Sequence, residues 1–307
     1  MASTEKRVVT ILGATGTQGG AVVRHLSKLG GFDLRAVTRN PSSDSASKLA
    51  LLPNVTLYQG DMSRPDSLKD AFTGAEAVFA ITNFYDLVDN SLEEARQGCA
   101  MADLAQEVGV GLFIWSSIPS ALIRTGAKYA SNPLVENKSV VTRYLEYKNI
   151  PHVVVYVGWY YDNLVNWKTL TKTSDGSLEL KQALLRADAP QGFSWVEKDL
   201  GPTIAAILSR YRNNPEVLRR PVYSVARHDT LGNIMAEVKK QTGLEVRLDT
   251  PTTTGIKDLD ELYGYENEYG VLTDVALPDA WTLSLGVEFH SLELFVKEVI
   301  VPYVARL

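Results

Sequence analysis

The sequence holds few of the residues from which disulfide-linked or metal-binding proteins are built. Cys99 is the single cysteine among 307 residues, so the chain can form no internal disulfide and has no cysteine pair for a zinc site. The four histidines are widely scattered and show no metal-ligand spacing. We therefore expect a protein that holds no metal and works in a reducing compartment.

Long apolar runs and an excess of positive charge are also missing. The longest apolar stretch, residues 150–161, contains a proline and a histidine and is too short to cross a bilayer. The chain has 31 Lys and Arg against 36 Asp and Glu, a formal net charge of −5, whereas nucleic-acid binders carry basic surfaces. These features predict a protein that binds neither membranes nor nucleic acid.

The two ends of the sequence bear on its location. The polar N-terminus, MASTEKR, has no signal-peptide layout, which predicts a cytoplasmic protein. The C-terminal tripeptide Ala305-Arg306-Leu307 is a variant of the Ser-Lys-Leu address of peroxisomal proteins. A peroxisomal location is therefore the alternative.

The first half of the chain alternates apolar, strand-like runs with helix-like segments. Continuous apolar runs are typical of strands buried on both faces of a parallel sheet. Their alternation with helices predicts an α/β fold with a doubly wound parallel sheet of the Rossmann type. Strands are expected at residues 8–12, 34–38, 55–59, 77–81, 112–115 and 153–157, and helices at residues 19–29, 68–72, 93–109 and 137–148.

The second half loses this rhythm. We predict a dinucleotide-binding domain over residues 1–157. Residues 158–307 are predicted to form mainly a smaller C-terminal α/β lobe for substrate or partner, with some elements returning to the sheet. The lobe would lie over the carboxyl ends of the strands and leave a cleft for a small-molecule substrate. Helices are expected at residues 199–211, 231–242 and 291–304, and strands at residues 222–225 and 244–248.

The strongest local signal is a glycine-rich loop between the first strand and the first helix. Gly13-Ala14-Thr15-Gly16-Thr17-Gln18-Gly19 has the spacing of a dinucleotide-binding loop. In such loops the first glycine allows a tight turn, the second admits the pyrophosphate, and the third lets helix and strand pack closely. The amides at the helix N-terminus then face the phosphates. The alternative is a purely structural turn.

The end of the second predicted strand indicates which nucleotide binds. NAD sites place an acidic residue there to hold the ribose hydroxyls, whereas an arginine accommodates the 2′-phosphate of NADP. The sequence has Arg39 at this corner and no acid, and an arginine can contact a phosphate through two N–H groups. NADP(H) is therefore favoured over NAD(H), with an exposed loop arginine as the alternative.

Together with QGDM at residues 59–62 and AITN at residues 80–83, these motifs resemble the NmrA-like family. This family is an atypical branch of the short-chain dehydrogenase/reductase superfamily, related to isoflavone-reductase-like enzymes. The resemblance covers at least residues 8–202 and implies a set of cofactor-binding residues. They are Gly13, Thr15, Gly16, Thr17, Gln18 and Gly19 at the diphosphate, Arg39 at the adenosine phosphate, Asp61 and Met62 at the adenine, and Thr82, Asn83, Lys138, Tyr160 and Asn163 toward the nicotinamide.

The resemblance fails at the position of the proton donor. Short-chain dehydrogenases usually have a tyrosine four residues before the lysine that Lys138 matches, but this chain has Leu134, which has no proton to give. Candidates to replace the acid are Lys138 itself, Tyr160 and Ser117. Some NmrA-like proteins act as reductases, whereas others bind NADP(H) without turnover and act as regulators.

Aromatic residues follow the fifth and sixth predicted strands, at the edge where such sheets bind ligands. Trp115, Trp159 and Tyr161 are expected to form the wall of a substrate cleft, with packing at the lobe interface as the alternative. Two functions stay open. One is an NADPH-dependent reductase of a small conjugated or aromatic carbonyl, imine or quinone. The other is a non-catalytic redox sensor or transcriptional regulator that acts through a protein partner.

Two residues of the predicted helix at residues 93–109 are expected to be structural. Cys99 falls on an alanine-rich stripe and is expected to be a buried small residue. Glu94, beside Glu93, is expected on a solvated helix face.

Overall fold

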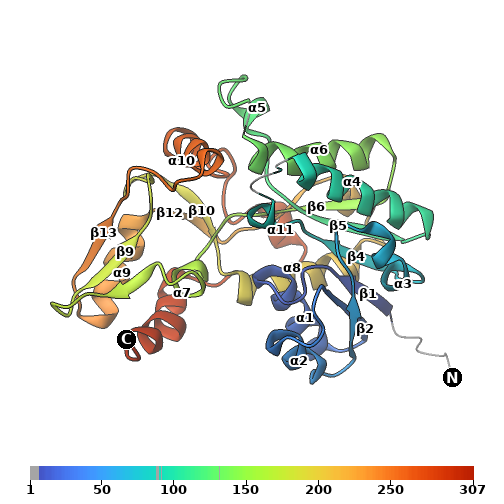
Figure 1. Ribbon diagram of the computed structural model, residues 1–307, viewed down its shortest axis with the longest axis horizontal. Coiled ribbons are helices and arrows are strands. Elements are labelled where there is room, and N and C mark those ends of the chain that lie inside the picture. Colours follow the sequence, from blue (N-terminus) through green and yellow to red (C-terminus); the bar gives the residue numbers. More distant parts are fainter. Residues whose placement is uncertain (1–6, 88–89, 91, 131) are drawn as a thin grey trace.

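A computed structural model describes residues 7–87, 90, 92–130 and 132–307 of the chain (Figure 1). Its centre is a seven-stranded sheet in the order β11-β6-β5-β4-β1-β2-β3, and its paired strands run parallel. The predicted doubly wound sheet is confirmed. The strands are β1 (Arg7–Ile11), β2 (Phe32–Thr38), β3 (Val55–Gln59), β4 (Ala77–Ala80), β5 (Leu112–Ser117), β6 (His152–Val157) and β11 (Val222–Ser224).

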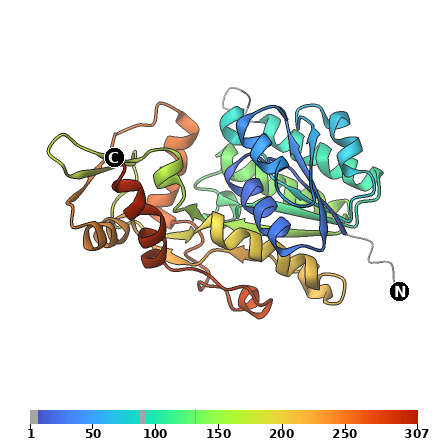
Figure 2. The same ribbon diagram turned by 90° about the horizontal axis from the view of Figure 1, so that it is seen from below.

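Helices cover both faces of this sheet because successive strand residues point to opposite faces. In β5, Leu112 and Ile114 face one core, and Phe113 and Trp115 face the other. Figures 1 and 2 show the two helical layers. One layer contains α1 (Thr17–Leu29), α2 (Asp44–Ala50), α8 (Val196–Arg210) and η3 (Pro215–Leu218). The other contains η1 (Pro65–Leu68), α3 (Lys69–Phe72), α4 (Leu92–Glu107) and α6 (Pro133–Tyr147).

The smaller lobe lies beside the sheet and ends at the C-terminus (Figure 2). It contains two three-stranded sheets and its own apolar core. One sheet is formed by β7 (Trp159–Tyr160), β10 (Gln191–Ser194) and β12 (Arg227–Asp229), and the other by β8 (Leu170–Lys172), β9 (Leu178–Lys181) and β13 (Val246–Asp249). The helices of the lobe are α7 (Asn163–Asn166), α9 (Leu231–Thr242), α10 (Lys257–Tyr269), α12 (Leu292–Phe295), η4 (Val296–Ile300) and α13 (Val301–Val304). Helix α11 (Ala280–Ser284) instead packs against β11 of the central sheet.

Residues 196–224 return from the lobe to the central sheet. Helix α8 packs against α1 at Gly201, where an added Cβ would lie 2.3 Å from His25 Cβ, and β11 pairs with β6. Asp162, just after β7, ties the two parts together because its carboxylate accepts hydrogen bonds from Val196 N (2.8 Å) and Glu197 N (3.2 Å) at the start of α8. The boundary at residues 157/158 stays a prediction. The core of the central sheet also includes side chains of residues 196–222, which follow that boundary.

Cys99 of α4 is less buried than predicted. It is half-buried at the margin of the core between α4 and α6, near Tyr144, and burial raises the pKa of its thiol. Gly98 approaches α6 closely, since an added Cβ there would lie 2.4 Å from Val141 Cγ2. Among the described residues, no helix has both the length and the apolar character needed to cross a membrane.

Candidate functional site

A cavity of about 760 Å³ lies at the carboxyl ends of the central strands, between the sheet and the lobe. Its volume is in the upper part of the range of ligand sites, roughly 300–1,000 Å³. The position is where open parallel sheets bind ligands, because β1 lies between β2 and β4 and the strand order reverses there. The wall includes the glycine loop, the ends of β2, β4, β5 and β6, and residues of α6 and α10.

The glycine loop has the backbone geometry that its sequence predicts. Gly13 has a φ of +58°, and Gly16 N donates to Gly13 O at 2.9 Å, which closes a tight turn. An added Cβ at Gly19 would lie 2.3 Å from Gly13 O, so only glycine fits there. No side chain caps the amides at the start of α1, and its first turn has no acidic residue. The loop therefore fits the diphosphate of a dinucleotide.

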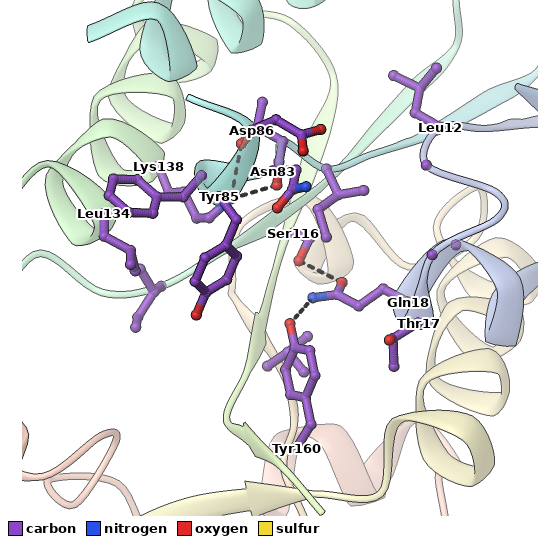
Figure 3. A pocket seen from close by; sticks show the side chains of 18 of the residues that line it. Leu12, Thr17, Gln18, Asn83, Tyr85, Asp86, Ser116, Leu134, Lys138 and Tyr160 are labelled. Carbon is purple, nitrogen blue, oxygen red and sulfur yellow. Dashed lines mark hydrogen bonds between the residues drawn. The ribbon is translucent and has the colours of Figure 1, made fainter. Parts of the chain in front are cut away.

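Gln18 connects the loop to the far side of the cavity (Figure 3). Ser116 Oγ donates to Gln18 Oε1 at 2.8 Å, and Gln18 Nε2 donates to the Tyr160 hydroxyl. Burial raises the pKa of Tyr160 to about 12, so the phenol stays protonated at neutral pH. Tyr160 is therefore placed to donate a hydrogen bond to a ligand.

Lys138 belongs to a buried ion pair. Its Nζ lies 2.9 Å from Glu94 Oε1 and 2.9 Å from Thr82 Oγ1, and it donates to Thr82 O at 3.2 Å. The Thr82 hydroxyl donates in turn to Glu94 Oε1 at 2.8 Å. The prediction of a solvated Glu94 is wrong, because its side chain is only 1% exposed. The three ammonium hydrogens have three protein acceptors, so a cofactor hydroxyl has to displace one of them to reach Lys138.

Arg39 lies at the other end of the cavity, where its guanidinium is 3.0 Å from Asp86 of η2 (Phe84–Asp86). Both side chains are largely exposed, so the pair is screened by solvent and easily exchanged for another anion. Met62 also lines this end. Asp61, expected at the adenine, is not part of the wall. Its carboxylate instead accepts from Ser63 N and Oγ, which lowers its pKa.

Of the aromatic residues predicted for the cleft, Trp159 lines the cavity. Trp115 and Tyr161 lie instead in the two neighbouring cores and are fully buried. The Trp115 indole donates to Lys138 O, and the Tyr161 hydroxyl to Asp229 Oδ2. For Trp115 the difference follows from strand alternation, because Ser116, the next residue of β5, takes the cavity side. Tyr161 lies just after β7, whose residues Trp159 and Tyr160 both line the cavity, and it packs into the core of the lobe.

The remaining predicted residues all line the cavity, but one of them, Ser117, already has a hydrogen-bond partner within the protein. Thr15, Thr17, Asn83, Asn163 and Ser117 are all part of the wall. The Ser117 hydroxyl lies 3.2 Å from Thr142 Oγ1 of α6, so this candidate acid already has a protein partner. Leu134 also lines the wall and lies beside Lys138 on α6 (Figure 3).

Several wall residues carry no sequence signal. Tyr85 and Trp167 pack edge to face with ring centroids 5.3 Å apart, and Trp159 and Tyr263 lie 5.9 Å apart. Tyr85 comes from η2, Trp167 directly follows α7 and Tyr263 belongs to α10, which follows the glycine loop by more than two hundred residues. Nothing in the local sequence patterns connects these segments.

Glu266 of α10 is the least expected wall residue. Its side chain is 3% exposed, and its Oε2 has no hydrogen-bond partner among the described residues. Burial raises the pKa of this carboxyl group to about 8, although a hydrogen bond from Trp159 acts in the opposite direction. Glu266 is therefore largely protonated near neutral pH.

This burial predicts a pH-dependent stability. The pKa is raised from 4.5 in a free glutamate to about 8 in the folded protein, so the folded state binds more protons between these values. Stability is therefore lost as pH rises through this window, by on the order of 3–5 kcal/mol. Glu266→Gln should remove this loss. Urea unfolding at pH 5 and pH 9 tests it, and an equal change in both proteins would contradict it.

Metal binding has no support in the side-chain arrangement. Within the part of the chain that the structure describes, no group of three or more His, Cys, Asp or Glu side chains is placed to hold a metal ion. The cavity wall instead offers hydroxyl, amide and aromatic groups together with the buried carboxyl group of Glu266.

The sequence of this chain is similar to those of several known proteins. The family model described as "NmrA-like family" matches residues 5–269. The NmrA-like family domain-containing oxidoreductase hkm9 of Aspergillus hancockii is 34% identical over 52% of this chain and 48% of that protein. The oxidoreductase cpsB of Aspergillus campestris is 31% identical over 67% of this chain and 65% of that protein. The chain spans about half the length of several relatives that it matches.

Comparison with solved structures gives matches over nearly the whole chain. NmrA, a negative transcriptional regulator solved in complex with NADP, matches with a TM-score of 0.79 and 20% identity over 98% of both chains. The NADPH-dependent quinone oxidoreductase QOR2 of Escherichia coli, solved with NADPH, matches with a TM-score of 0.69 and 22% identity over 95% of this chain and 99% of that one. At such identities these likenesses establish the shared fold.

Proposed function

The chain belongs to the NmrA-like family, and from this premise we propose that it is an NADPH-dependent reductase. Its substrate is a small conjugated or aromatic carbonyl, imine or quinone. The observation that carries the proposal is the continuity of the cavity. Arg39 and the glycine loop line one part of it, and Trp159, Tyr263 and Glu266 line another. A dinucleotide on the first part leaves the aromatic part for a flat acceptor.

The wall offers a partner for each portion of the cofactor. The amides from Gly13 to Gly19 would hold the diphosphate and Arg39 the 2′-phosphate, with Met62 beside the adenine. Thr82, Asn83, Tyr160 and Asn163 would lie along the nicotinamide half. When bound, NADPH supplies a hydride. The NADPH complex of QOR2 supports this choice of cofactor, whereas NmrA has been solved both with NADP and with NAD.

The protein's own contribution would be orientation of the acceptor. Rings of Trp159 and Tyr263 form a surface on which a flat molecule can stack. Tyr160, whose hydroxyl accepts from Gln18, keeps its own hydrogen for a ligand oxygen. Lys138 would act by holding Thr82 and the end of β4 in place. An acceptor held in this orientation loses less entropy on going to the transition state, which lowers the activation free energy.

The choice of NADP(H) predicts a large effect at Arg39. Arg39→Ala should weaken NADPH binding by about 10–100-fold, because a charge-assisted contact to the phosphate is lost, and should leave NADH binding unchanged. Calorimetric titration of the purified protein with NADPH, NADP+, NADH and NAD+ measures this. Equal loss for both reduced nucleotides would contradict the assignment.

Asp86 provides the matched control for that variant. Asp86→Asn releases Arg39 from its ion pair and should tighten NADPH binding about threefold, since surface pairs contribute roughly 0.2–1 kcal/mol. Weaker binding of NADPH to Asp86→Asn would place Arg39 elsewhere than at the phosphate.

The reductase activity itself is tested with the wild-type protein, by following NADPH oxidation with a panel of quinones, enones and imines. No oxidation with any of them would refute the reductase.

Leu134 supports a second candidate function. A leucine one helical turn before Lys138 lines the cavity, where short-chain dehydrogenases usually have their tyrosine, so a non-catalytic redox sensor is the alternative. A sensor needs unequal affinity of its states for NADPH and NADP+. A large difference between the two affinities, with nucleotide-dependent protection from proteolysis and no turnover, would favour it.

A further inference from the structure

We propose that Glu266 is the acid of this cavity: its carboxyl group donates a hydrogen bond, and then a proton, to the carbonyl or quinone oxygen of the substrate. This inference rests on the proposed reductase function and deepens it. Glu266 would serve as the proton donor in place of the usual tyrosine, whose position is occupied here by Leu134. Leu134 lies on α6, whereas Glu266 lies on α10 of the lobe.

The position of Glu266 is that of a ligand-binding group. It forms the wall of the cavity with Trp159, Leu262, Tyr263 and Val271, yet its Oε2 finds no hydrogen-bond partner among the described residues. A buried polar atom without a partner costs free energy. An acceptor atom of a substrate lying in the cavity would recover that cost, because a protonated carboxyl group is a donor.

Helix α10 is fixed at its carboxyl end, which holds Glu266 in place. Gln191 Nε2 donates to Glu266 O at 2.9 Å, and Val271 N donates to Gln191 Oε1 at 2.7 Å. From α5 (Ala121–Arg124), Arg124 donates to the Tyr265 hydroxyl at 2.9 Å and to Tyr269 O at 3.0 Å. An acid on so constrained a backbone is pre-organised for proton transfer.

The titratable groups that face Glu266 are phenols. They are Tyr85 from η2 and Tyr263 and Tyr265 from α10. Burial raises the pKa of Tyr263 to about 12 and raises those of Tyr85 and Tyr265 as well, so all three stay neutral near pH 7. Trp159 donates from its indole. Of Glu266 and these three phenols, Glu266 is the group whose pKa lies near neutral pH.

The charged residues elsewhere in the wall have partners of their own. Lys138 is paired with Glu94, and Arg39 with Asp86. Arg124, behind α10, has Tyr265 and Asp274 as its partners. No lysine or arginine among the described residues forms an ion pair with Glu266, which leaves its proton available to a ligand.

The chemistry balances with one hydride and one proton. The hydride, with its electron pair, passes from reduced nicotinamide to the carbonyl carbon, and NADPH is oxidised to NADP+. The O–H bond of Glu266 breaks as the new O–H bond forms on the substrate oxygen, and the carboxylate then regains a proton from solvent. With a quinone, transfer of the hydride to one quinone oxygen gives the hydroquinone anion, and the proton of Glu266 then passes to the other oxygen to give the hydroquinone.

Binding is tested without turnover in the complex of the protein with NADP+ and menadione, which cannot react because both are oxidised. Wild-type affinity for menadione should be constant at acid pH and fall about tenfold as Glu266 loses its proton. Glu266→Gln keeps an N–H donor and should bind equally at all pH values. Glu266→Leu should bind about tenfold more weakly at acid pH.

Turnover gives the second readout. Glu266→Gln should lower kcat about 100-fold, the scale of a lost general acid, with little change in KM. Glu268→Gln is the matched control, because Glu268 lies on the same helix but pairs with Lys128 on the surface, and it should behave as wild type. If Glu266→Gln keeps the wild-type kcat and pH profile, the proposal is wrong while the reductase function stands. If wild type neither binds menadione nor oxidises NADPH, both are wrong.

Discussion

Replacing Lys138 with methionine is expected to lower the free energy of unfolding by about 3–5 kcal/mol, the usual cost of removing one partner of a buried ion pair. The Lys138 and Glu94 side chains are 15% and 1% exposed, and the lysine contacts Glu94 Oε1, whereas Glu94 Oε2 has no hydrogen-bond partner among the described residues. Without the lysine, the donor that remains to this carboxylate among the described residues is the Thr82 hydroxyl. Urea unfolding of both proteins at neutral pH measures the loss.

Glu94→Gln separates the charge from the packing. Alone, it leaves the ammonium group with the two Thr82 oxygens and should also destabilise the protein. Combined with Lys138→Met it removes both charges, and most of the lost stability should return. If the double variant is as unstable as the sum of the two single ones, the ion pair contributes no coupling energy.

The same variants decide how Lys138 serves the cofactor. If it acts through Thr82, Thr82→Val should weaken NADPH binding as much as Lys138→Met does, because both release the end of β4. If Lys138 contacts the cofactor directly, Thr82→Val should bind more tightly than Lys138→Met. Calorimetric titration with NADPH, at a temperature where all variants are folded, distinguishes the two.

The sequence predicted those parts of the fold that local patterns specify. The strand at residues 55–59 and the helix at residues 231–242 have the predicted bounds, and the glycine loop has the predicted turn. In each case a run of suitable residues is bounded by turn-forming ones. Short strands such as β7 and β12, of two and three residues, are too brief for any periodicity.

The wall of the cavity was predictable only in part, because contacts across the lobe have no local signature. Trp115 lies in a core and not in the cleft, because neighbouring residues of β5 face opposite sides and Ser116 takes the cavity side. Tyr161, just after β7, packs into the core of the lobe, a contact that the local sequence does not specify. The sequence pattern predicted a surface glutamate at Glu94, but the residues after β4 and Lys138 of α6 bury its side chain. Glu266 enters the site through tertiary packing alone.

A methyl group at Gly19 is expected to weaken NADPH binding about 100-fold, the scale of a displacement near 1 Å in a binding site. The added Cβ would lie 2.3 Å from Gly13 O, 2.6 Å from Gly13 C and 2.7 Å from Leu12 O. All three are backbone atoms, so the loop or the helix has to move. Overpacking of this kind also costs about 1–3 kcal/mol of stability.

Gly20→Ala is the matched control, one residue further along the same helix. Its added Cβ lies 2.9 Å from a guanidinium nitrogen at the end of the flexible Arg24 side chain, which can move away, and its nearest backbone atom, Ala14 O, is 3.3 Å away, compared with 2.3 Å at Gly19. Alanine is favoured over glycine in a helix interior by about 1 kcal/mol, so this variant should be at least as stable as wild type and bind NADPH normally. Calorimetric titration and thermal melting of the two variants side by side test the pair. Gly19 lies against the backbone of Gly13, whereas Gly20 does not. Equal NADPH affinity of the two variants would therefore mean that the close packing of α1 on Gly13 does not shape the nucleotide site.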